Sequence, residues 1–169
     1  MTKPLLLIDV DGPLNPYAAQ RERRPEGYTT HRMRPGGWLE TKPLRVWLNP
    51  RHGGELLALA EAYELVWATT WKGEANHWIG PHLGLPELPF IDWPVMHGKA
   101  PRGTFWKTQY ILEYAEGRPF AWVDDDITSY DTEYVEANHL AAALLLRVDP
   151  RIGLIRPDFD ALAEWAAAL

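Results

Sequence analysis

Short apolar segments that end in acidic residues constrain the fold of this chain more than any other feature. Residues 4–9, PLLLID, end in Asp9, and residues 119–126, PFAWVDDD, end in three consecutive aspartates. A short, continuously apolar run is typical of a strand that is buried on both faces of a parallel sheet. Because the ligand crevice of such a sheet lies beyond the carboxyl ends of its strands, we expect these acids to meet there.

Other segments fit strands and helices that alternate along the chain. Residues 64–70, ELVWATT, predict a second buried strand that ends in Thr69 and Thr70. Helices are expected at residues 51–63, 104–114 and 158–168, the end of another helix at residues 137–140, and further strands at residues 89–93 and 143–148. Strands that alternate with helices form a parallel sheet with helices on both faces. We therefore predict an α/β fold, a three-layer Rossmann-like sheet of about five strands.

The composition bounds the number of domains and the kinds of metal site. The chain has 169 residues, 46% of them apolar, which is enough for one full hydrophobic core, and we expect a single domain over residues 1–169. No apolar run approaches the ~20 residues that cross a bilayer. The N-terminal residues do not resemble a secretory signal, so we expect a cytoplasmic protein without membrane contact. Because there is no cysteine, any metal must be bound by oxygen or imidazole ligands.

A basic insertion interrupts the regular pattern at about residues 16–50. It contains five prolines and three glycines, with short strands expected near residues 28–33 and 44–48. Residues 20–51 carry eight Lys or Arg and three Glu, a charge of +5, which leaves −11 for the rest because the whole chain is −6. Two interpretations stay open: a solvated loop, or a flap that faces an anionic substrate and offers Arg32 and Arg34 for binding.

The polar residues at the predicted strand ends fit phosphoryl transfer. A carboxylate held at the end of a strand, such as Asp9, is positioned to attack phosphorus in line. Asp11 leaves the strand two residues later and can protonate the leaving group and then accept a proton from water. Thr69 and Lys107 can donate hydrogen bonds to the phosphoryl oxygens. Each residue alone also fits an ordinary structural role, so the inference depends on their order and common placement.

The crowding of carboxylates at this edge predicts a bound cation. Asp9, Asp124 and Asp125 would repel one another unless they shared a divalent ion. Oxygen-only ligands favour Mg²⁺. We therefore expect Mg²⁺ as the cofactor.

At this point the chain resembles the haloacid dehalogenase-like (HAD) hydrolase superfamily. LLLIDVDGPLNP resembles the first motif of that superfamily, LVWATTW the second, Lys107 the third and FAWVDDD the fourth. These motifs span residues 5–126. The other candidate for the third motif is Lys99, but Lys107 lies where the superfamily has its lysine, in the first turn of the helix before the fourth motif.

The resemblance implies roles for the motif residues. Asp9 would be the nucleophile, Asp11 the acid and base and a metal ligand through its carbonyl group, and Asp125 a direct metal ligand with Asp124 beside it. Candidates for substrate binding are Gly12, Thr70, Arg32 and Arg34. An aspartate at the position of Asp11 is typical of the phosphatases and phosphotransferases of the superfamily, whereas its dehalogenases lack this residue.

The resemblance also implies a minimally capped member, because neither the basic insertion nor the irregular, proline-rich stretch at residues 71–103 is large enough for a cap domain. Such members have an open crevice and often accept large substrates. We therefore expect a Mg²⁺-dependent phosphomonoester hydrolase that acts through an aspartyl-phosphate, on a nucleotide, a nucleic-acid end or another large phosphorylated molecule. No obligate protein partner is expected. The alternative is a non-catalytic phosphate-binding or phosphoacceptor module of the same fold.

Overall fold

Four parallel strands form the central sheet in the computed structural model, which describes residues 2–169. They are β1 (Leu5–Ile8), β4 (Glu64–Trp67), β5 (Phe120–Asp124) and β6 (Ala143–Arg147), in the order β4-β1-β5-β6. β1 lies between β4 and β5, with Leu5 paired with Glu64 on one side and with Phe120 on the other. The chain that follows β1 therefore emerges beside the acidic end of β5.

The sheet has four strands instead of about five because residues 89–93 do not form one. Trp67 donates its backbone N–H to the carbonyl of Pro89 at 2.9 Å, and Ile91 donates to the carbonyl of Trp67 at 2.9 Å. Only a single bridge, between Trp67 and Phe90, results. Pro89 and Pro94 flank this stretch, and a proline has no N–H to donate to a ladder. The segment therefore runs along the edge of β4 without extending the sheet.

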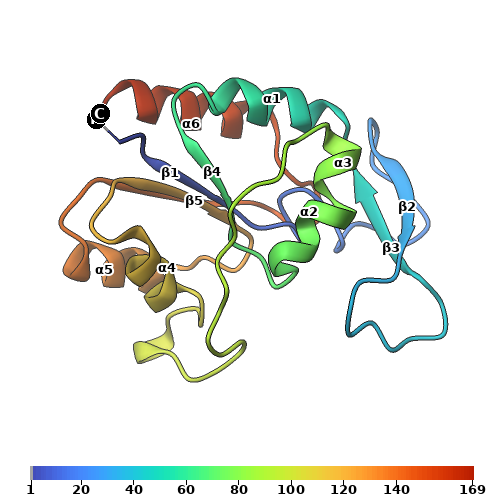
Figure 1. Cartoon of the computed structure of the whole chain (residues 1–169), viewed down its shortest axis with the longest axis horizontal. Helices are drawn as coiled ribbons and strands as arrows, with labels where there is room; N and C mark the ends of the chain where they lie inside the picture. The colour runs from blue at the N-terminus through green and yellow to red at the C-terminus, as the bar shows by residue number, and fades with distance from the viewer. Residues whose placement is uncertain (1) are drawn as a thin grey trace.

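Helices cover both faces of the sheet, which confirms the predicted three layers (Figure 1). One face carries α1 (Arg51–Leu59) and α6 (Arg156–Ala167), and the other carries α4 (Thr108–Ala115) and α5 (Ser129–Asn138). Successive side chains of β1 point to opposite faces of the sheet, as the two-residue period of a strand requires. Leu6 and Ile8 pack in one buried cluster with α1 and α6, and Leu5 and Leu7 pack in the other with α4.

Some helix boundaries differ from the sequence prediction. α1 ends at Leu59 instead of residue 63, and α4 begins at Thr108 instead of residue 104. Lys107 therefore lies at the N-cap of α4. The expected helix end near residues 137–140 is the end of α5, but the sequence does not predict where α5 begins, because only Asp131 and Val135 of its ten residues are buried. A helix with so small a buried face has no clear apolar stripe in its sequence.

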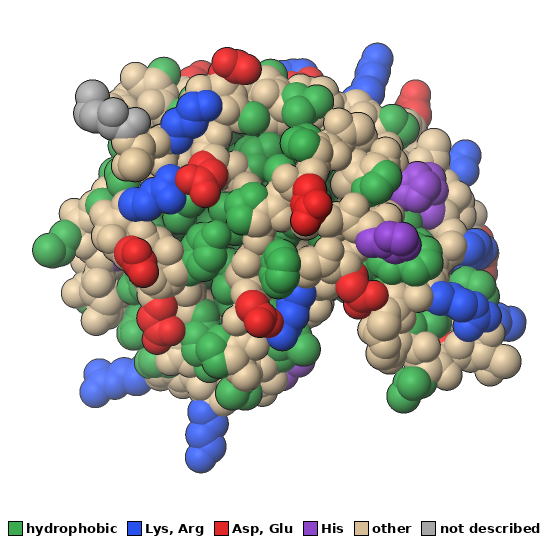
Figure 2. Space-filling model, in the orientation of Figure 1, with side chains coloured by type: hydrophobic (Ala, Val, Ile, Leu, Met, Phe, Trp, Pro, Cys, Tyr) green, Lys and Arg blue, Asp and Glu red, His purple; other side chains and the backbone are tan. Residues whose placement is uncertain are grey.

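The expected basic insertion is a hairpin that packs against the body. Its strands, β2 (Thr29–Met33) and β3 (Leu44–Leu48), pair antiparallel and lie at the right of Figure 1. Met33, Val46 and Leu48 belong to the same buried cluster as Leu6 and Ile8. Lys and Arg side chains gather over this hairpin at the right of Figure 2, and a notch separates its loop from the body.

The second insertion, the stretch at residues 71–103 between β4 and α4, consists of short helices and loops. It contains the 3-10 helices η1 (Lys72–Glu74) and η2 (Pro101–Gly103) and the helices α2 (Ala75–Trp78) and α3 (Gly80–Leu83). Ala75, Ile79 and Leu83 pack into the buried cluster beneath α1. Across residues 2–169 there is no separate cap domain, as predicted. None of the helices in that range combines the length and the apolar character needed to cross a bilayer.

Candidate active site

Three carboxylates meet at the carboxyl edge of the sheet. Asp9 follows β1, Asp124 is the last residue of β5, and Asp125 follows it. One oxygen from each of these residues lies within 4.8 Å of the other two. The three residues are buried, with exposed fractions of 7%, 0% and 6%. The tertiary structure thus brings together residues that are more than a hundred positions apart, as the strand ends predict.

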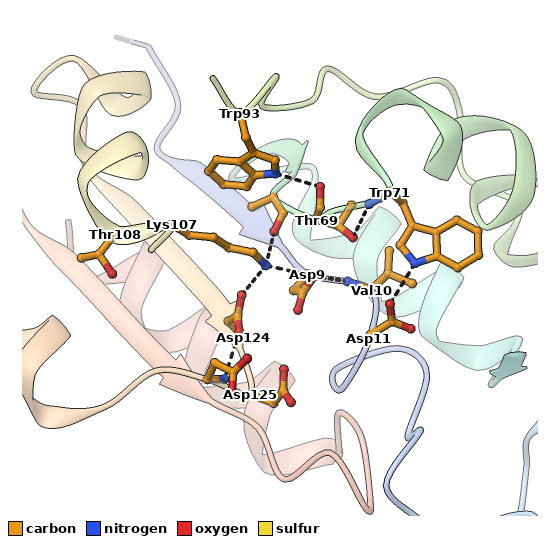
Figure 3. A network of polar contacts seen from close by, with 12 residues as sticks. Asp9, Val10, Asp11, Thr69, Trp71, Trp93, Lys107, Thr108, Asp124 and Asp125 are labelled. Carbon is orange, nitrogen blue, oxygen red and sulfur yellow. Dashed lines mark hydrogen bonds and ion pairs between the residues drawn. The ribbon is translucent and has the colours of Figure 1, made fainter. Parts of the chain in front are cut away.

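Lys107 lies between two of these carboxylates (Figure 3). Its Nζ is 3.2 Å from Oδ1 of Asp9 and 2.8 Å from Oδ2 of Asp124. It also donates a hydrogen bond to the carbonyl of Ala68, at the end of β4, at 2.9 Å. Lys99 is exposed in the loop before η2 and forms no ion pair in the part of the chain that the structure describes. Lys107 is therefore the lysine that joins the acids at this site.

The site carries more negative charge than Lys107 neutralises. Burial raises the pKa of Asp9, and the neighbouring Asp124 raises it further, while Lys107 opposes both effects. Burial also raises the pKa of Asp125 to about 6. The pKa of Lys107 is raised, because the two carboxylates beside it outweigh the effect of burial. Three carboxylates and one ammonium group leave a net charge of −2, and a divalent cation with oxygen ligands fits that donor set.

Asp11 lies beside the three carboxylates and is held by two neutral donors. Its Oδ1 accepts a hydrogen bond from Nδ2 of Asn15 at 2.8 Å, and its Oδ2 accepts one from Nε1 of Trp71 at 2.9 Å. The side chain of Asp11 is not one of the three that converge within 4.8 Å. Its expected contribution to a metal through the carbonyl group stays a prediction.

Gly12 allows the turn after β1 to approach Asp125 closely. Its φ is +103°, in a region that side chains rarely adopt, and a Cβ placed there would lie 2.6 Å from Cγ of Asp125. The substrate-binding role predicted for Gly12 stays a prediction. The observed effect of having no side chain at this position is to let the turn fit against the acidic end of β5.

The two threonines after β4 have different surroundings. Thr69 is fully buried, and its Oγ1 accepts the backbone N–H of Trp71 at 3.2 Å. Its carbonyl accepts a hydrogen bond from Nε1 of Trp93 at 2.9 Å. Thr70 is exposed and lines the cavity in front of the carboxylates. Of the two, Thr70 is in direct reach of a molecule in that cavity.

The cavity has a volume of about 450 Å³ and opens between the body and the hairpin. Asp9, Asp11, Thr70, Lys107 and Asp125 line it from the body. Trp38, a loop tryptophan that the sequence places near the crevice, lines the cavity from the hairpin. Three further residues of the hairpin and of the segment before it complete the wall, and sequence reasoning did not single them out: Asn15, Tyr17 and Arg45. The hairpin therefore contributes directly to the candidate site.

Tyr17 and Asn15 support the acidic residues from the segment after β1. The hydroxyl of Tyr17 donates to Oδ2 of Asp125 at 2.8 Å. Asn15, which donates to Asp11, also accepts the backbone N–H of Trp47 in β3 at 3.1 Å. The one local signal for these roles is the turn sequence DGPLNPY that contains both residues.

The predicted flap arginines do not line the cavity that contains Asp9. Arg32 is exposed and faces a neighbouring groove. The guanidinium group of Arg34 donates to the carbonyl groups of Glu40 and Thr41 at 3.3 and 2.7 Å, within the loop of the hairpin. Arg45 is the hairpin arginine that lines the cavity.

Asp131 anchors the segment that carries Lys107. This carboxylate is fully buried, and its Oδ1 accepts the backbone N–H of Phe105 at 2.7 Å and the hydroxyl of Thr108 at 2.6 Å. Its Oδ2 accepts the N–H of Thr128, which caps α5. Asp131 thereby connects the start of α5 to the residues on both sides of Lys107.

The sequence profile of one family matches nearly the whole chain. That family is described as "HAD domain in Swiss Army Knife RNA repair proteins", and the match covers residues 5–159. The matched range includes all four strands of the sheet, the hairpin and the candidate site. Comparison with curated proteins and with solved structures gives no significant match.

Proposed function

The chain belongs to the family of HAD domains in Swiss Army Knife RNA repair proteins, and from this premise we propose that it is a Mg²⁺-dependent phosphatase acting on phosphorylated nucleic-acid ends. The observation that carries the proposal is the position of Lys107 between Asp9 and Asp124, beside Asp125. A buried arrangement of three carboxylates and one lysine at strand ends has few structural uses, since burying charges is costly. It suits the binding of a metal and a phosphoryl group.

The contacts of Asp9 favour one of its oxygens as the nucleophile. Oδ1 accepts the backbone N–H of Val10 at 2.9 Å and faces Lys107. Across residues 2–169, no protein group donates a hydrogen bond to Oδ2 of Asp9. We assign Oδ2 the in-line attack that forms the bond to phosphorus while the ester P–O bond breaks.

Asp11 supplies the proton transfers in this proposal. It gives a proton to the departing ester oxygen, and in the second step it takes one from the water that attacks the aspartyl-phosphate, which releases phosphate and restores Asp9. Asn15 and Trp71 hold its carboxylate at the cavity wall. A divalent cation bound by Asp9, Asp124 and Asp125 would supply positive charge opposite the phosphoryl oxygens.

Lys107 and Thr70 would bind the phosphoryl oxygens, and the same role for Thr69, which does not line the cavity, stays a prediction. Lys107 lines the cavity with its ammonium group next to Asp9. Thr70 reaches the cavity from its wall, and the hydroxyl proton of Thr69 is not used in any hydrogen bond among residues 2–169. Donors held in place before the reaction stabilise the developing charge without reorganising.

The substrate class follows from the family and from the open site. The family name refers to RNA repair proteins, in which terminal phosphates on nucleic acids are a natural substrate. No cap domain within residues 2–169 closes the cavity, so a polymer can approach it. We therefore propose a nucleic-acid end in preference to a small phosphorylated metabolite.

The first test follows phosphate release with Mg²⁺ from oligonucleotides phosphorylated at the 3′ or the 5′ end and from an aryl phosphate. Asp9→Asn should lower turnover by roughly 10³-fold or more, the scale seen when other enzymes lose a nucleophile. Its unfolding temperature should stay near that of the parent, because Asn has the same shape and Lys107 keeps its ion pair with Asp124. Asp160→Asn, on the surface of α6, is the matched control. Full activity of Asp9→Asn would exclude the mechanism, and binding without release by the parent would favour a non-catalytic phosphate-binding module.

The second test addresses the metal. Mg²⁺ should raise the unfolding temperature of the parent, because a ligand selective for the folded state stabilises it, by about 2.7 kcal/mol at a concentration 100 times Kd. Asp125→Ala should bind Mg²⁺ more weakly and show a smaller rise. Equal Mg²⁺ affinity of the two proteins would show that Asp125 is not a ligand.

A further inference from the structure

Three arginines of the hairpin region lie together on the wall of a groove beside the active-site cavity. The register of β2 and β3 places Arg32 directly opposite Arg45, so both side chains leave the same face of the hairpin. Arg21 joins them, because Nη1 of Arg45 donates to its carbonyl at 2.6 Å. All three residues line a groove of about 1010 Å³.

These arginines form no ion pair with another residue in the described part of the chain. None of the ion pairs in residues 2–169 involves Arg21, Arg32 or Arg45. Glu22 and Glu40 also line the groove, but neither lies within ion-pair distance of an arginine. Burial lowers the pKa of Arg45, and the positive charges of Arg32 and Arg21 lower it further. Three guanidinium groups held together without an anion favour binding of one from solution.

The geometry of Arg45 suits a phosphate. Its guanidinium group lies over the ring of Trp47, 3.7 Å from the centroid, which fixes its plane. Its Nη1 donates a hydrogen bond to the carbonyl of Arg21, whereas Nε and Nη2 have no acceptor in the described part of the chain. A guanidinium group with a fixed plane and free N–H groups can bind two oxygens of one phosphate at once.

The groove lies next to the active-site cavity. Tyr17, Trp38, Leu44 and Arg45 line both hollows, so the groove and the cavity adjoin along these four residues. The ring of Trp38 is fixed at this junction, because its Nε1 donates to the carbonyl of Lys42 at 2.8 Å. In a nucleic-acid strand the sugar that joins two phosphates carries a base, so an aromatic ring between two anion sites is placed to stack on that base. Such stacking does not depend on sequence.

We propose that Arg21, Arg32 and Arg45 bind the internucleotide phosphate next to the terminal phosphate of a single-stranded nucleic acid, with a base stacked on Trp38. This inference rests on the proposed function, since the cavity with Asp9 would hold the terminal phosphate. It goes further by defining the minimal substrate as a dinucleotide. A single strand is required, because only an unpaired base presents its face to a side chain.

The first experiment compares kcat/KM for three compounds with the same terminal phosphate. They are a mononucleotide, a dinucleotide with one phosphodiester, and the same dinucleotide with an uncharged methylphosphonate linkage. The phosphodiester dinucleotide should be hydrolysed about tenfold more efficiently than either of the others, because charge-assisted hydrogen bonds to a phosphate are strong. Equal values for the three compounds would overturn the proposal.

The second experiment removes the groove charges. In Arg21→Gln/Arg32→Gln, the ratio of kcat/KM for the phosphodiester and methylphosphonate dinucleotides should fall close to one. The matched control is Arg23→Gln/Arg24→Gln, which removes two charges from the same insertion but from a separate hollow lined by residues 18–20 and Arg151. The control should keep the parental ratio, and an equal loss in both variants would show only a general charge effect and overturn the site.

A binding measurement separates this inference from the proposed function. Fluorescence anisotropy with a labelled, end-phosphorylated pentanucleotide should show weaker binding to Arg21→Gln/Arg32→Gln. The slope of log Kd against log salt should shrink by about 0.7 for each phosphate that the variant no longer neutralises. Binding that depends on these arginines without any phosphate release would refute the phosphatase but keep the groove.

Two other outcomes would overturn the groove and not the enzyme. One is Asp9-dependent hydrolysis of the aryl phosphate together with oligonucleotide binding that is the same in the parent and in Arg21→Gln/Arg32→Gln. The other is a phosphoserine peptide that is hydrolysed more efficiently than the dinucleotide and that loses this advantage in Arg21→Gln/Arg32→Gln. The second result would identify the groove as a surface that recognises a phosphoprotein.

Discussion

Replacement of Lys107 by methionine tests the electrostatic description of the site most directly. Lys107 is 2% exposed, and its ammonium group contacts Asp9, Asp124 and the carbonyl of Ala68. Methionine fills similar space without a charge, so Lys107→Met leaves two buried carboxylates without their cation. Breaking a buried ion pair in this way costs about 3–5 kcal/mol. For a protein of this size, each kcal/mol corresponds to roughly 2–4 °C in unfolding temperature, so a decrease of about 10 °C is expected.

The assay is thermal and urea unfolding in buffer with a chelator, followed by the same measurement with Mg²⁺. The difference between Lys107→Met and the parent should be larger without metal, because a divalent cation can replace the missing positive charge. Lys99→Met is the matched control. Lys99 is exposed, and its replacement should change stability by no more than about 0.5 kcal/mol.

The pH dependence of Lys107→Met has a defined sign. Burial already raises the pKa of Asp9, and loss of Lys107 removes the main opposing charge. Between the unfolded and the folded pKa of Asp9, the folded state binds more protons, so stability falls as pH rises. The deficit of Lys107→Met should therefore be larger at about pH 8 than at about pH 5. Adding Asp124→Asn to Lys107→Met should recover part of the loss, since it neutralises one of the stranded carboxylates.

One result would refute this reasoning. If Lys107→Met and Lys99→Met unfold at the same temperature without metal, the lysine is not the buried partner of Asp9 and Asp124. The alternative assignment of the third motif to Lys99 would then need to be reconsidered.

Two further predictions follow from the geometry near the site and from the core beneath α6. Gly12→Ala should destabilise the protein by about 2 kcal/mol or more and weaken its response to Mg²⁺, because the new Cβ would meet Asp125. The control is Gly37→Ala, which should cost less because Gly37 also has a positive φ, +82°, but has nothing within 4 Å of the new Cβ. Equal losses of stability in urea unfolding would contradict this prediction. Burial lowers the pKa of His52 to about 4, so the unfolded state binds more protons between about pH 6.5 and 4, and stability falls by up to about 3 kcal/mol as pH decreases through that window. His52→Gln, which can still donate to the carbonyl of Leu154, should show a shallower fall, whereas an unchanged slope of stability against pH would argue against a buried neutral imidazole.

The sequence predicts the layers of the fold because they depend on local patterns. Residues 4–9 and 119–126 are continuously apolar up to their terminal acids, which indicates strands buried on both faces, and both strands are confirmed. The start of α5 is missed because this helix buries little, and the short strand expected at residues 89–93 is wrong because its pairing stops at a single bridge in a stretch flanked by prolines. These failures concern segments whose structure depends on neighbours distant in the chain.

The candidate site is predicted in part for the same reason. Asp9, Asp124 and Asp125 follow from strand ends, since a parallel sheet brings its carboxyl ends together. The partners that hold them do not follow: Tyr17 lies 108 positions from Asp125, and Trp71 lies 60 positions from Asp11. No local pattern encodes hydrogen bonds over such separations.

The basic charge of the insertion follows from the sequence, but the contacts of its arginines follow from the fold. The sequence by itself determines that residues 20–51 are basic and that Lys99 and Lys107 are the candidates for the third motif. Only the tertiary structure decides that Arg34 binds the loop of the hairpin while Arg45 lines the cavity, and that Lys107 reaches Asp9. The physical reason is that composition and periodicity act over a few residues, whereas strand register and chain packing decide which side chains share a cavity.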